Sequence, residues 1–570
     1  MAAVAKAPST LETASSGFDF VGALRALRAG EASDAWLSRW LPVAYADPEA
    51  FEQALYDWVA LRRSGLKASR TGPFDLYGDC VLAHLGAKKR ATVVASTRGV
   101  QQLSYEELHR RSGALYSAWR ARGVEPGQVV LLGLPVGIDY AIALVTALRL
   151  GVVLCPAPAA GPAFLHQRLL DAKPDFAVLR ERDQALLRNL STQQLPIAGE
   201  RDLGAADSYS YATDEAALRC FSAFGREPLA PLDVPAGMLH AALLRDSQLV
   251  FALDSSDTLA APGWDPLLCQ PSLLLTCLFA GAAYAELGVE DVIREPRLLD
   301  AVGASLLGVS PRLRDGFTLL SEWPTNSVRA WFRSLTHALD WSEWERLGQL
   351  SNAKGIACFN MALAQSAGGA LLFGARLKQD PNLRAWPVPG RPWLLTEVAG
   401  GTLESFGDAG VYTPTLEEEA IAGVPQLVLS RKLRGYECSG AIDLGPDAQA
   451  YPIEEVSRVV ARHPLVAHAS VVVSGGRGIN GANVTLLAFV EDGALERGEL
   501  LRWLEGEMGQ RYLPSRVEVF ALQPRVGEEG IDHGWCRSQY LSGALTKKAR
   551  DPLFRMISRL GYLLAAPAGA

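Results

Sequence analysis

The stretch LSYEELHRRSGALYSAWRARGVEPGQVV, residues 103–130, contains a complete helix signal followed by the start of a buried strand. Ser104 and Glu107 have the spacing of a capping box, in which the serine oxygen accepts a hydrogen bond from the backbone N–H three residues later. Apolar residues then recur at helical spacing, and Gly123 is where we expect the helix to end. The order of a capped amphipathic helix and then an apolar strand indicates an α/β protein.

The same alternation continues on both sides of this stretch. ATVVAS at 91–96 reads as a strand, IDYAIALVTALRLG at 138–151 as a helix and VVLCPAP at 152–158 as the next strand. Strands alternating with helices predict a parallel sheet. Further along, YPIEEVSRVVARHPLVAHASVVV at 451–473 predicts a helix from Ile453 and a strand from Ala469, and ANVTLLAFVED at 482–492 predicts another strand.

These patterns divide the chain into four segments. We expect a helical extension over 1–72, a large layered α/β domain over 73–436, a small α+β domain over 440–540 and a helical tail over 541–570. The chain of 570 residues is too long for one hydrophobic core, which agrees with this division.

Composition limits the partners and the compartment. The net charge is −7 with no basic block, which argues against nucleic acid and anionic membranes as partners. The eight cysteines occur singly, a pattern typical of reduced thiols. The most apolar stretch, 129–158, is interrupted by Pro135, Gly137 and Asp139, so it is expected to be buried strand and helix rather than a membrane span. We expect a cytoplasmic protein.

The order of these elements resembles the adenylate-forming (ANL) superfamily of acyl-CoA synthetases, nonribosomal adenylation domains and luciferases. The resemblance is carried by residues 103–130 and 451–473 and by RYLPSRVEVFALQPR at 511–525. It implies a large N-terminal domain of layered βαβ sheets and a small C-terminal α+β domain. It also implies a two-step reaction, in which ATP activates a carboxylate as an acyl-adenylate and a thiol then displaces AMP.

The phosphate-holding loop of that family is altered here. The family reads S-G-T-T-G-x-P-K, in which the backbone N–H groups, the hydroxyls and the lysine hold the phosphates. Residues 222–229 read SAFGREPL. Ser222 and Pro228 match, but Phe224 replaces a threonine and Leu229 replaces the lysine. The resemblance therefore implies that this loop no longer holds phosphate.

The family's Y-G-x-T-E motif is altered in the same sense. Its positions are occupied by Phe359, Asn360, Met361, Ala362 and Leu363. The aromatic ring that stacks on adenine is kept, whereas the magnesium-binding glutamate is replaced by leucine, which offers no oxygen ligand. We expect Phe359, Met361 and Ala362 to border the substrate, and we expect no metal site.

The closing loop of the family, P-R-x-x-x-G-K-I-x-R, aligns with PRVGEEGIDH at 524–533. Gly530 stands at the position of the lysine that neutralises charge during adenylation, and His533 stands at the position of the arginine. Losing one such positioned charge commonly costs about a hundredfold or more in rate. Together with the two altered motifs, this predicts that neither ATP nor magnesium is used.

The acyl pocket of the family keeps possible ligand-binding residues. The pocket strand often reads L-P-x-x-H, and this chain has AAPGWDPLL at 260–268, which places Trp264 and Asp265 there. An Asp–Trp pair could hold an aromatic acyl group that carries an amine or a hydroxyl. The alternative interpretation is an aspartate on a surface turn next to a packing tryptophan.

The pattern of losses resembles degenerate members of the superfamily that move anthranilate from coenzyme A to an acyl carrier protein in aurachin-type polyketide biosynthesis. We therefore expect an acyltransferase whose substrates are a coenzyme A thioester and the phosphopantetheine arm of a carrier protein. Transfer could be direct, or it could use Cys358 as nucleophile with His240 as base, although both residue types are commonly structural in such places.

Two other functions stay open. One is a non-catalytic pseudoenzyme that docks a carrier protein or a partner enzyme, and the other is an acyl- or aryl-CoA ligase with unusual ATP contacts.

Overall fold

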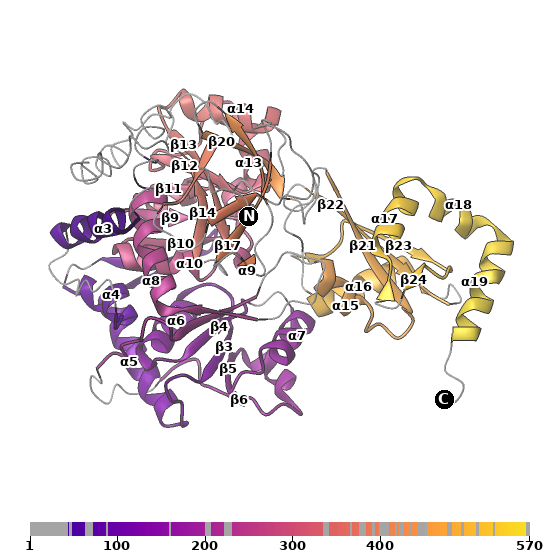
Figure 1. Ribbon diagram of the computed structural model, residues 1–570, viewed down its shortest axis with the longest axis horizontal. Coiled ribbons are helices and arrows are strands. Elements are labelled where there is room, and N and C mark those ends of the chain that lie inside the picture. The colour runs from indigo at the N-terminus through magenta and orange to yellow at the C-terminus, as the bar shows by residue number, and fades with distance from the viewer. Residues whose placement is uncertain are drawn as a thin grey trace, which may run out of the picture. The chain divides into compact units, whose positions relative to one another are not determined.

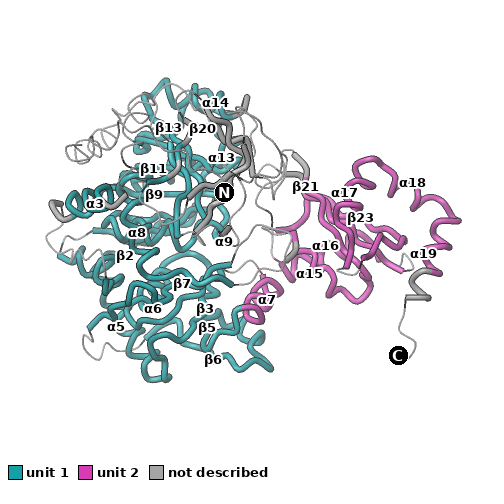
Figure 2. The backbone as a smooth tube through the Cα atoms, in the orientation of Figure 1, with its two compact units in different colours: residues 1–158, 172–222, 231–442 teal, residues 159–171, 223–230, 443–570 magenta. Residues whose placement is uncertain are grey.

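The computed structural model divides into two compact units (Figure 2). Unit 1 comprises residues 1–158, 172–222 and 231–442, and unit 2 comprises residues 159–171, 223–230 and 443–570. The structure describes residues 41, 44, 48–62, 72–86, 89–158, 161–199, 207–221, 231–334, 341–364, 368–374, 384–389, 394–397, 410–416, 419–420, 427–432, 435–441, 451, 453–475, 482–491, 495–508, 512–527 and 530–565. The helical extension expected over 1–72 lies mostly outside these residues.

Unit 1 contains a six-stranded sheet with the order β6-β5-β3-β4-β7-β8. Its strands pair in parallel except for β7 and β8, which are antiparallel. Every side chain of β3, VVLLG, is buried, as in a sheet covered on both faces. The strands are β3 (Val129–Gly133), β4 (Val153–Pro156), β5 (Phe176–Leu179), β6 (Gln193–Gln194), β7 (Ala216–Cys220) and β8 (Leu232–Pro235).

A second, 14-stranded sheet contains β13, which carries the predicted site residues Cys358, Phe359, Met361, Ala362 and Leu363. Its central strands β1, β10, β9, β11, β12 and β13 pair in parallel, and antiparallel strands extend it at both ends. The strands are β1 (Arg90–Ser96), β2 (Gly99–Ser104), β9 (Thr258–Ala260), β10 (Ala283–Leu287), β11 (Leu306–Gly308), β12 (Ala330–Ser334), β13 (Ala357–Ala364), β14 (Gly369–Phe373), β15 (Arg384–Pro387), β16 (Leu394–Glu397), β17 (Gly410–Leu416), β18 (Glu419–Ala420), β19 (Leu427–Lys432) and β20 (Gly435–Ala441).

The helices of unit 1 pack around these sheets (Figure 1). They are α3 (Pro48–Arg62), α4 (Leu76–Cys80), α5 (Tyr105–Arg120), α6 (Ile138–Leu150), α8 (Ala236–Arg245), α9 (Pro266–Cys269), α10 (Ser272–Ala280), α11 (Val289–Arg294), α12 (Arg297–Val302), α13 (Pro311–Thr318) and α14 (Trp341–Asn352), together with short 3-10 turns at Leu82–His84 and Glu181–Leu187 and a π-helical turn at Asp246–Val250. Helix α7 (Pro162–Ala172) belongs to unit 2 over all but its last residue.

The predicted start of α5 is confirmed. Ser104 Oγ accepts a hydrogen bond from the Glu107 backbone N–H at 3.1 Å. The other half of the capping box is not used for capping, because the Glu107 carboxylate accepts two hydrogen bonds from the Arg110 guanidinium at 2.6 and 2.9 Å. This ion pair holds the pKa of Glu107 below its usual value. The predicted helix over 138–151 is also confirmed, and it ends where Gly151 adopts the left-handed conformation at φ +75°.

Unit 2 is a small α+β unit with a three-stranded sheet, β21-β22-β23. Its predicted helix from Ile453 and its two predicted strands are confirmed. The elements are α15 (Ile453–Val460), β21 (His468–Gly475), β22 (Ala482–Phe489), α16 (Arg497–Met508), β23 (Arg516–Phe520), the hairpin strands β24 (Val526–Gly527) and β25 (Gly530–Ile531), α17 (His533–Leu541), α18 (Ala544–Arg550) and α19 (Pro552–Ala565).

The fold class expected from the sequence is therefore confirmed: layered βαβ sheets with a small α+β unit. Within the described residues, every helix is too short or too polar to cross a bilayer.

Candidate active site

Strand β13 carries five of the predicted site residues and separates them onto two faces; they are Cys358, Phe359, Met361, Ala362 and Leu363. It lies parallel to β12, with Cys358 opposite Trp331 and Phe359 opposite Phe332. Successive side chains of a strand point to opposite faces. Phe359, Met361 and Leu363 accordingly belong to the same apolar cluster as Trp264, whereas Cys358 belongs to a different cluster with Trp331. Ala362 is fully buried opposite Leu372 of β14.

Four aromatic rings pack together on the first of these faces. The Trp264 ring meets the Phe332 ring edge-to-face with centroids 5.2 Å apart. The Phe332 ring stacks on the Phe359 ring at 5.3 Å, and the Phe251 ring approaches Phe332 edge-on at 5.2 Å. Such pairs stabilise by about 0.5–1.5 kcal/mol each beyond their buried area. We call Phe251, Trp264, Phe332 and Phe359 the aromatic wall.

Two members of the aromatic wall, Trp264 and Phe359, were predicted from the sequence, and the residue that joins them was not. Phe332 contacts both rings directly. A signal for it was present in the sequence, because AWFRS at 330–334 is an apolar strand of the same parallel set, although nothing in that stretch indicates which neighbours it meets.

Asp265 is buried and caps a helix. Its side chain is 7% exposed, so it does not lie on a surface turn. Its Oδ1 accepts a hydrogen bond from the Leu267 backbone N–H at 3.0 Å and forms the N-cap of α9, with Pro266 at the first helical position. The carboxylate therefore fixes the chain directly after Trp264. Asp265 has this structural role whether or not it also binds a substrate.

His240 is engaged in the core of unit 1. One ring nitrogen, Nδ1, lies 3.0 Å from the Tyr56 hydroxyl, and the other, Nε2, lies 3.0 Å from Asp79 Oδ2. The imidazole also stacks on the Phe74 ring at 4.7 Å and is 2% exposed. These contacts join α8 to α3 and α4. They give His240 a structural role and do not connect it to the aromatic wall.

Cys358 lies on the opposite face of β13 among aromatic and cationic side chains. The Trp331 and Trp344 rings stack at 6.0 Å, and the Arg333 guanidinium lies 5.0 Å from the centre of the Trp344 ring. Arg333 Nε also donates a hydrogen bond to Asn360 Oδ1 at 2.7 Å. This face is covered by α13 and α14. The structure therefore does not bring Cys358 together with Trp264 and Phe359.

Three other cysteines are poor nucleophiles for a physical reason. Burial raises the pKa of the Cys220 and Cys277 thiols far above neutrality, and it raises the pKa of Cys536 to about 12. Because the thiolate is the reactive form, these side chains stay protonated and unreactive at neutral pH.

The positions expected to have lost charge differ in their surroundings. Leu363 is 9% exposed and packs in the apolar cluster that contains the aromatic wall. Gly530 begins β25 in a hairpin with β24, and its φ of +111° lies in a region that favours glycine over a lysine. Ser222, Phe224 and Leu229 lie outside the described residues.

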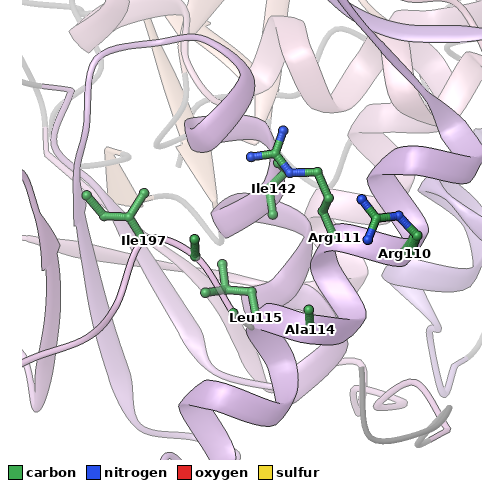
Figure 3. Close-up of a pocket in the computed structure, with 8 residues that line it drawn as sticks. Arg110, Arg111, Ala114, Leu115, Ile142 and Ile197 are labelled. Carbon is green, nitrogen blue, oxygen red and sulfur yellow. The ribbon is translucent and has the colours of Figure 1, made fainter. Parts of the chain in front are cut away.

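A cavity of about 150 Å³ lies elsewhere in unit 1 (Figure 3). Arg110 and Arg111 stand at its edge, and both are ion-paired, Arg110 with Glu107 at 2.6 Å and Arg111 with Asp139 at 3.1 Å. The cavity is lined by Arg110, Arg111, Ala114, Leu115, Ile142, Ile197, Ala198 and Gly199. None of the predicted site residues lines it.

Comparison with known proteins identifies the fold. Residues 83–224 match the AMP-binding enzyme family. No curated protein sequence matches the chain. Among solved structures, the chain is similar to o-succinylbenzoate CoA synthetase from Bacillus subtilis, with 14% identity, a TM-score of 0.61, and coverage of 82% of this chain and 98% of that one.

Two further structures show the same likeness. An artificially fused adenylation–PCP di-domain from Klebsiella oxytoca has 12% identity and a TM-score of 0.61, over 78% of this chain and 93% of that one. An anthranilate CoA ligase, solved with anthranoyl-AMP, has 12% identity and a TM-score of 0.55, over 83% of this chain and 98% of that one. We conclude that the chain is built on the fold of the adenylate-forming superfamily and carries the AMP-binding sequence pattern over residues 83–224.

Proposed function

We propose that the chain is an acyltransferase that moves an acyl or aryl group from coenzyme A to an acyl carrier protein without using ATP. The observation that carries this proposal is that the aromatic wall lies in the same apolar cluster as Leu363, the residue at the position where the family has a magnesium-binding glutamate. We infer that magnesium ATP does not fit these residues, because leucine supplies no oxygen to a hard cation.

The transfer of a thioester needs no activation by ATP. The thiol of the carrier protein's pantetheine arm attacks the carbonyl carbon of the coenzyme A thioester and forms a new C–S bond. The bond to the coenzyme A sulfur then breaks, and the proton lost by the attacking thiol goes to the departing thiolate. Because one thioester replaces another, the reaction is close to balanced in free energy. The protein has only to bind and orient the two partners.

The aromatic wall suits an aryl group. A flat ring gains both buried apolar area and ring–ring contacts against Trp264 and Phe359. The similarity of the fold to an anthranilate CoA ligase supports an aryl group as the substrate. The similarity to an adenylation domain fused to a carrier protein supports a carrier protein as the acceptor.

A non-catalytic docking protein is the second candidate. It is favoured by the direct packing of the four rings of the aromatic wall on one another, at centroid distances of 5.2 and 5.3 Å for Trp264–Phe332 and Phe332–Phe359. A transferase has to open this wall when it binds an aryl group, whereas a docking protein does not.

The test of the transferase is the mass of a phosphopantetheinylated carrier protein after incubation with the chain and a panel of short, long and aromatic CoA thioesters, without ATP. We expect the carrier to gain the mass of an aromatic acyl group. If no thioester transfers and none binds in calorimetry, the docking protein is the correct interpretation.

Replacing the cysteine on β13 tests the route of transfer. Because Cys358 faces away from the aromatic wall, we expect Cys358→Ser to keep the transfer rate within about twofold and the wild-type chain to carry no covalent acyl group. The rate and the intact mass of the chain are the measurements. A loss of more than a hundredfold, with unchanged thermal stability and an acylated wild type, would establish an acyl-cysteine instead.

Two substitutions of Asp265 separate its cap from its charge. Asp265→Ala removes the cap of α9 and should lower the free energy of unfolding by about 1 kcal/mol. Asparagine caps as well as aspartate does, so Asp265→Asn should keep the stability. If the carboxylate holds an ortho-amino group, the activation free energy of transfer from anthraniloyl-CoA should rise by about 1.5–3 kcal/mol in the alanine variant. The rate of transfer from benzoyl-CoA should not change. Equal losses with both thioesters would restrict Asp265 to its structural role.

A further inference from the structure

Helix α19 exposes large apolar side chains to solvent. Leu553, Met556, Ile557 and Leu560 are 57, 56, 53 and 52% exposed, and Phe554 is 43% exposed. Scattered apolar side chains on a surface are ordinary, but five within one helix of 14 residues form a contiguous patch. An isolated helix of this length is marginal in water, so covering its apolar side would also stabilise it.

The apolar and cationic side chains of α19 lie on opposite sides. Successive residues of an α-helix are about 100° apart, which places Leu553, Ile557 and Leu560 within one narrow stripe. By the same count, Arg555 and Arg559 lie on the far side of the helix from this stripe, and both are exposed.

The surrounding segment is locally basic although the whole chain is acidic. Lys547 and Arg550 of α18 are exposed beside α19, and residues 552–565 contain no acidic side chain. Lys548 is engaged within unit 2, because its ammonium lies 5.2 Å from the centre of the Trp535 ring. Because the chain as a whole has a net charge of −7, its total charge gives no indication that this segment is basic.

The apolar core of unit 2 is covered without α19. Helices α17 and α18 place Cys536 and Leu545 against the sheet, together with Phe489 and Phe520 of β22 and β23. Among residues 552–560, the part of α19 whose side chains the structure describes, none belongs to this cluster, and Figure 1 shows α19 extending beyond α18. The apolar stripe of α19 is therefore not used to hold unit 2 together.

We propose that α19 is a membrane-surface helix, which lies in the headgroup region of an anionic bilayer with its apolar stripe towards the acyl chains. An interfacial helix has an apolar side and, on its polar side, arginines or lysines. The apolar side enters the boundary between headgroups and acyl chains, and the cationic side chains contact the anionic headgroups around the helix. This inference goes beyond the proposed function and does not depend on it.

The positions of the arginines distinguish a bilayer from a protein partner. A helix that binds in the groove of a protein presents its apolar stripe to that groove, so Arg555 and Arg559 on the far side would point away from an acidic partner. Pairing with a second copy through the apolar stripe would likewise leave Arg555 and Arg559 facing away from the contact, without an anionic partner. Anionic headgroups satisfy the apolar stripe and the arginines at once. This proposal differs from the expectation, drawn from the net charge, that membranes are not partners.

The test is flotation of the full-length protein with vesicles of 70% phosphatidylcholine and 30% phosphatidylserine, compared with pure phosphatidylcholine. We expect binding to the anionic vesicles at about 0.1 M salt and much weaker binding to the neutral ones. Ile557→Glu should abolish binding by placing a charge in the apolar stripe. Arg555→Glu combined with Arg559→Glu should weaken binding by about tenfold or more.

Leu319→Glu is the matched control, because Leu319 is an exposed leucine, 83% accessible, that lies in unit 1. It should bind like the wild type, and circular dichroism should report the same helix content for all variants in the absence of vesicles. The proposal is overturned if the wild type does not float with anionic vesicles, or if Ile557→Glu floats as well as Leu319→Glu. If the wild type does not float and Ile557→Glu removes dimerisation or binding to an acidic carrier protein, the apolar stripe is a protein-binding surface instead.

Discussion

The alternation of side chains along β13 constrains the chemistry that this site can perform. Neighbouring residues of an extended strand point to opposite faces, so Cys358 and Phe359 cannot line the same pocket. The aromatic wall occupies one face, and the Trp331–Trp344 stack occupies the other. Cys358 therefore does not face the aromatic wall, and we propose that the thiol of a carrier-bound pantetheine arm is the nucleophile instead.

The same alternation places Leu363, which we propose occupies the position of the family's magnesium-binding glutamate, on the apolar face of β13. Leu363 shares the apolar cluster of Phe359 and Met361. A glutamate at this buried position would need a cation or another partner to offset its desolvation, whereas leucine packs without one. We infer that giving up the metal ligand removes a desolvation cost and adds apolar packing, so the sheet that positions the aromatic wall is maintained.

Local signals in the sequence predicted much of the architecture, and contacts between distant segments were beyond them. The Ser104 cap and the left-handed Gly151 act within a few residues. The start of α5 and the end of α6 could therefore be inferred. His240 reaches Asp79 across a separation of 161 residues, and nothing near either residue indicates that contact. The burial of Asp265 and the central place of Phe332 depend in the same way on how strands meet. A helical tail was expected over 541–570, where α18 and α19 lie, but its local basic character was not recognised, because the net charge averages over the whole chain.

We infer that this adenylate-forming fold does not activate carboxylates with ATP. The most direct measurement is pyrophosphate–ATP exchange with magnesium, across short, long and aromatic carboxylic acids that include anthranilate and benzoate. An active aryl-CoA ligase, assayed in parallel, sets the positive level. We expect exchange indistinguishable from that of a reaction without carboxylate. Exchange that depends on any one of these acids would contradict it and would identify the chain as a ligase with unusual ATP contacts.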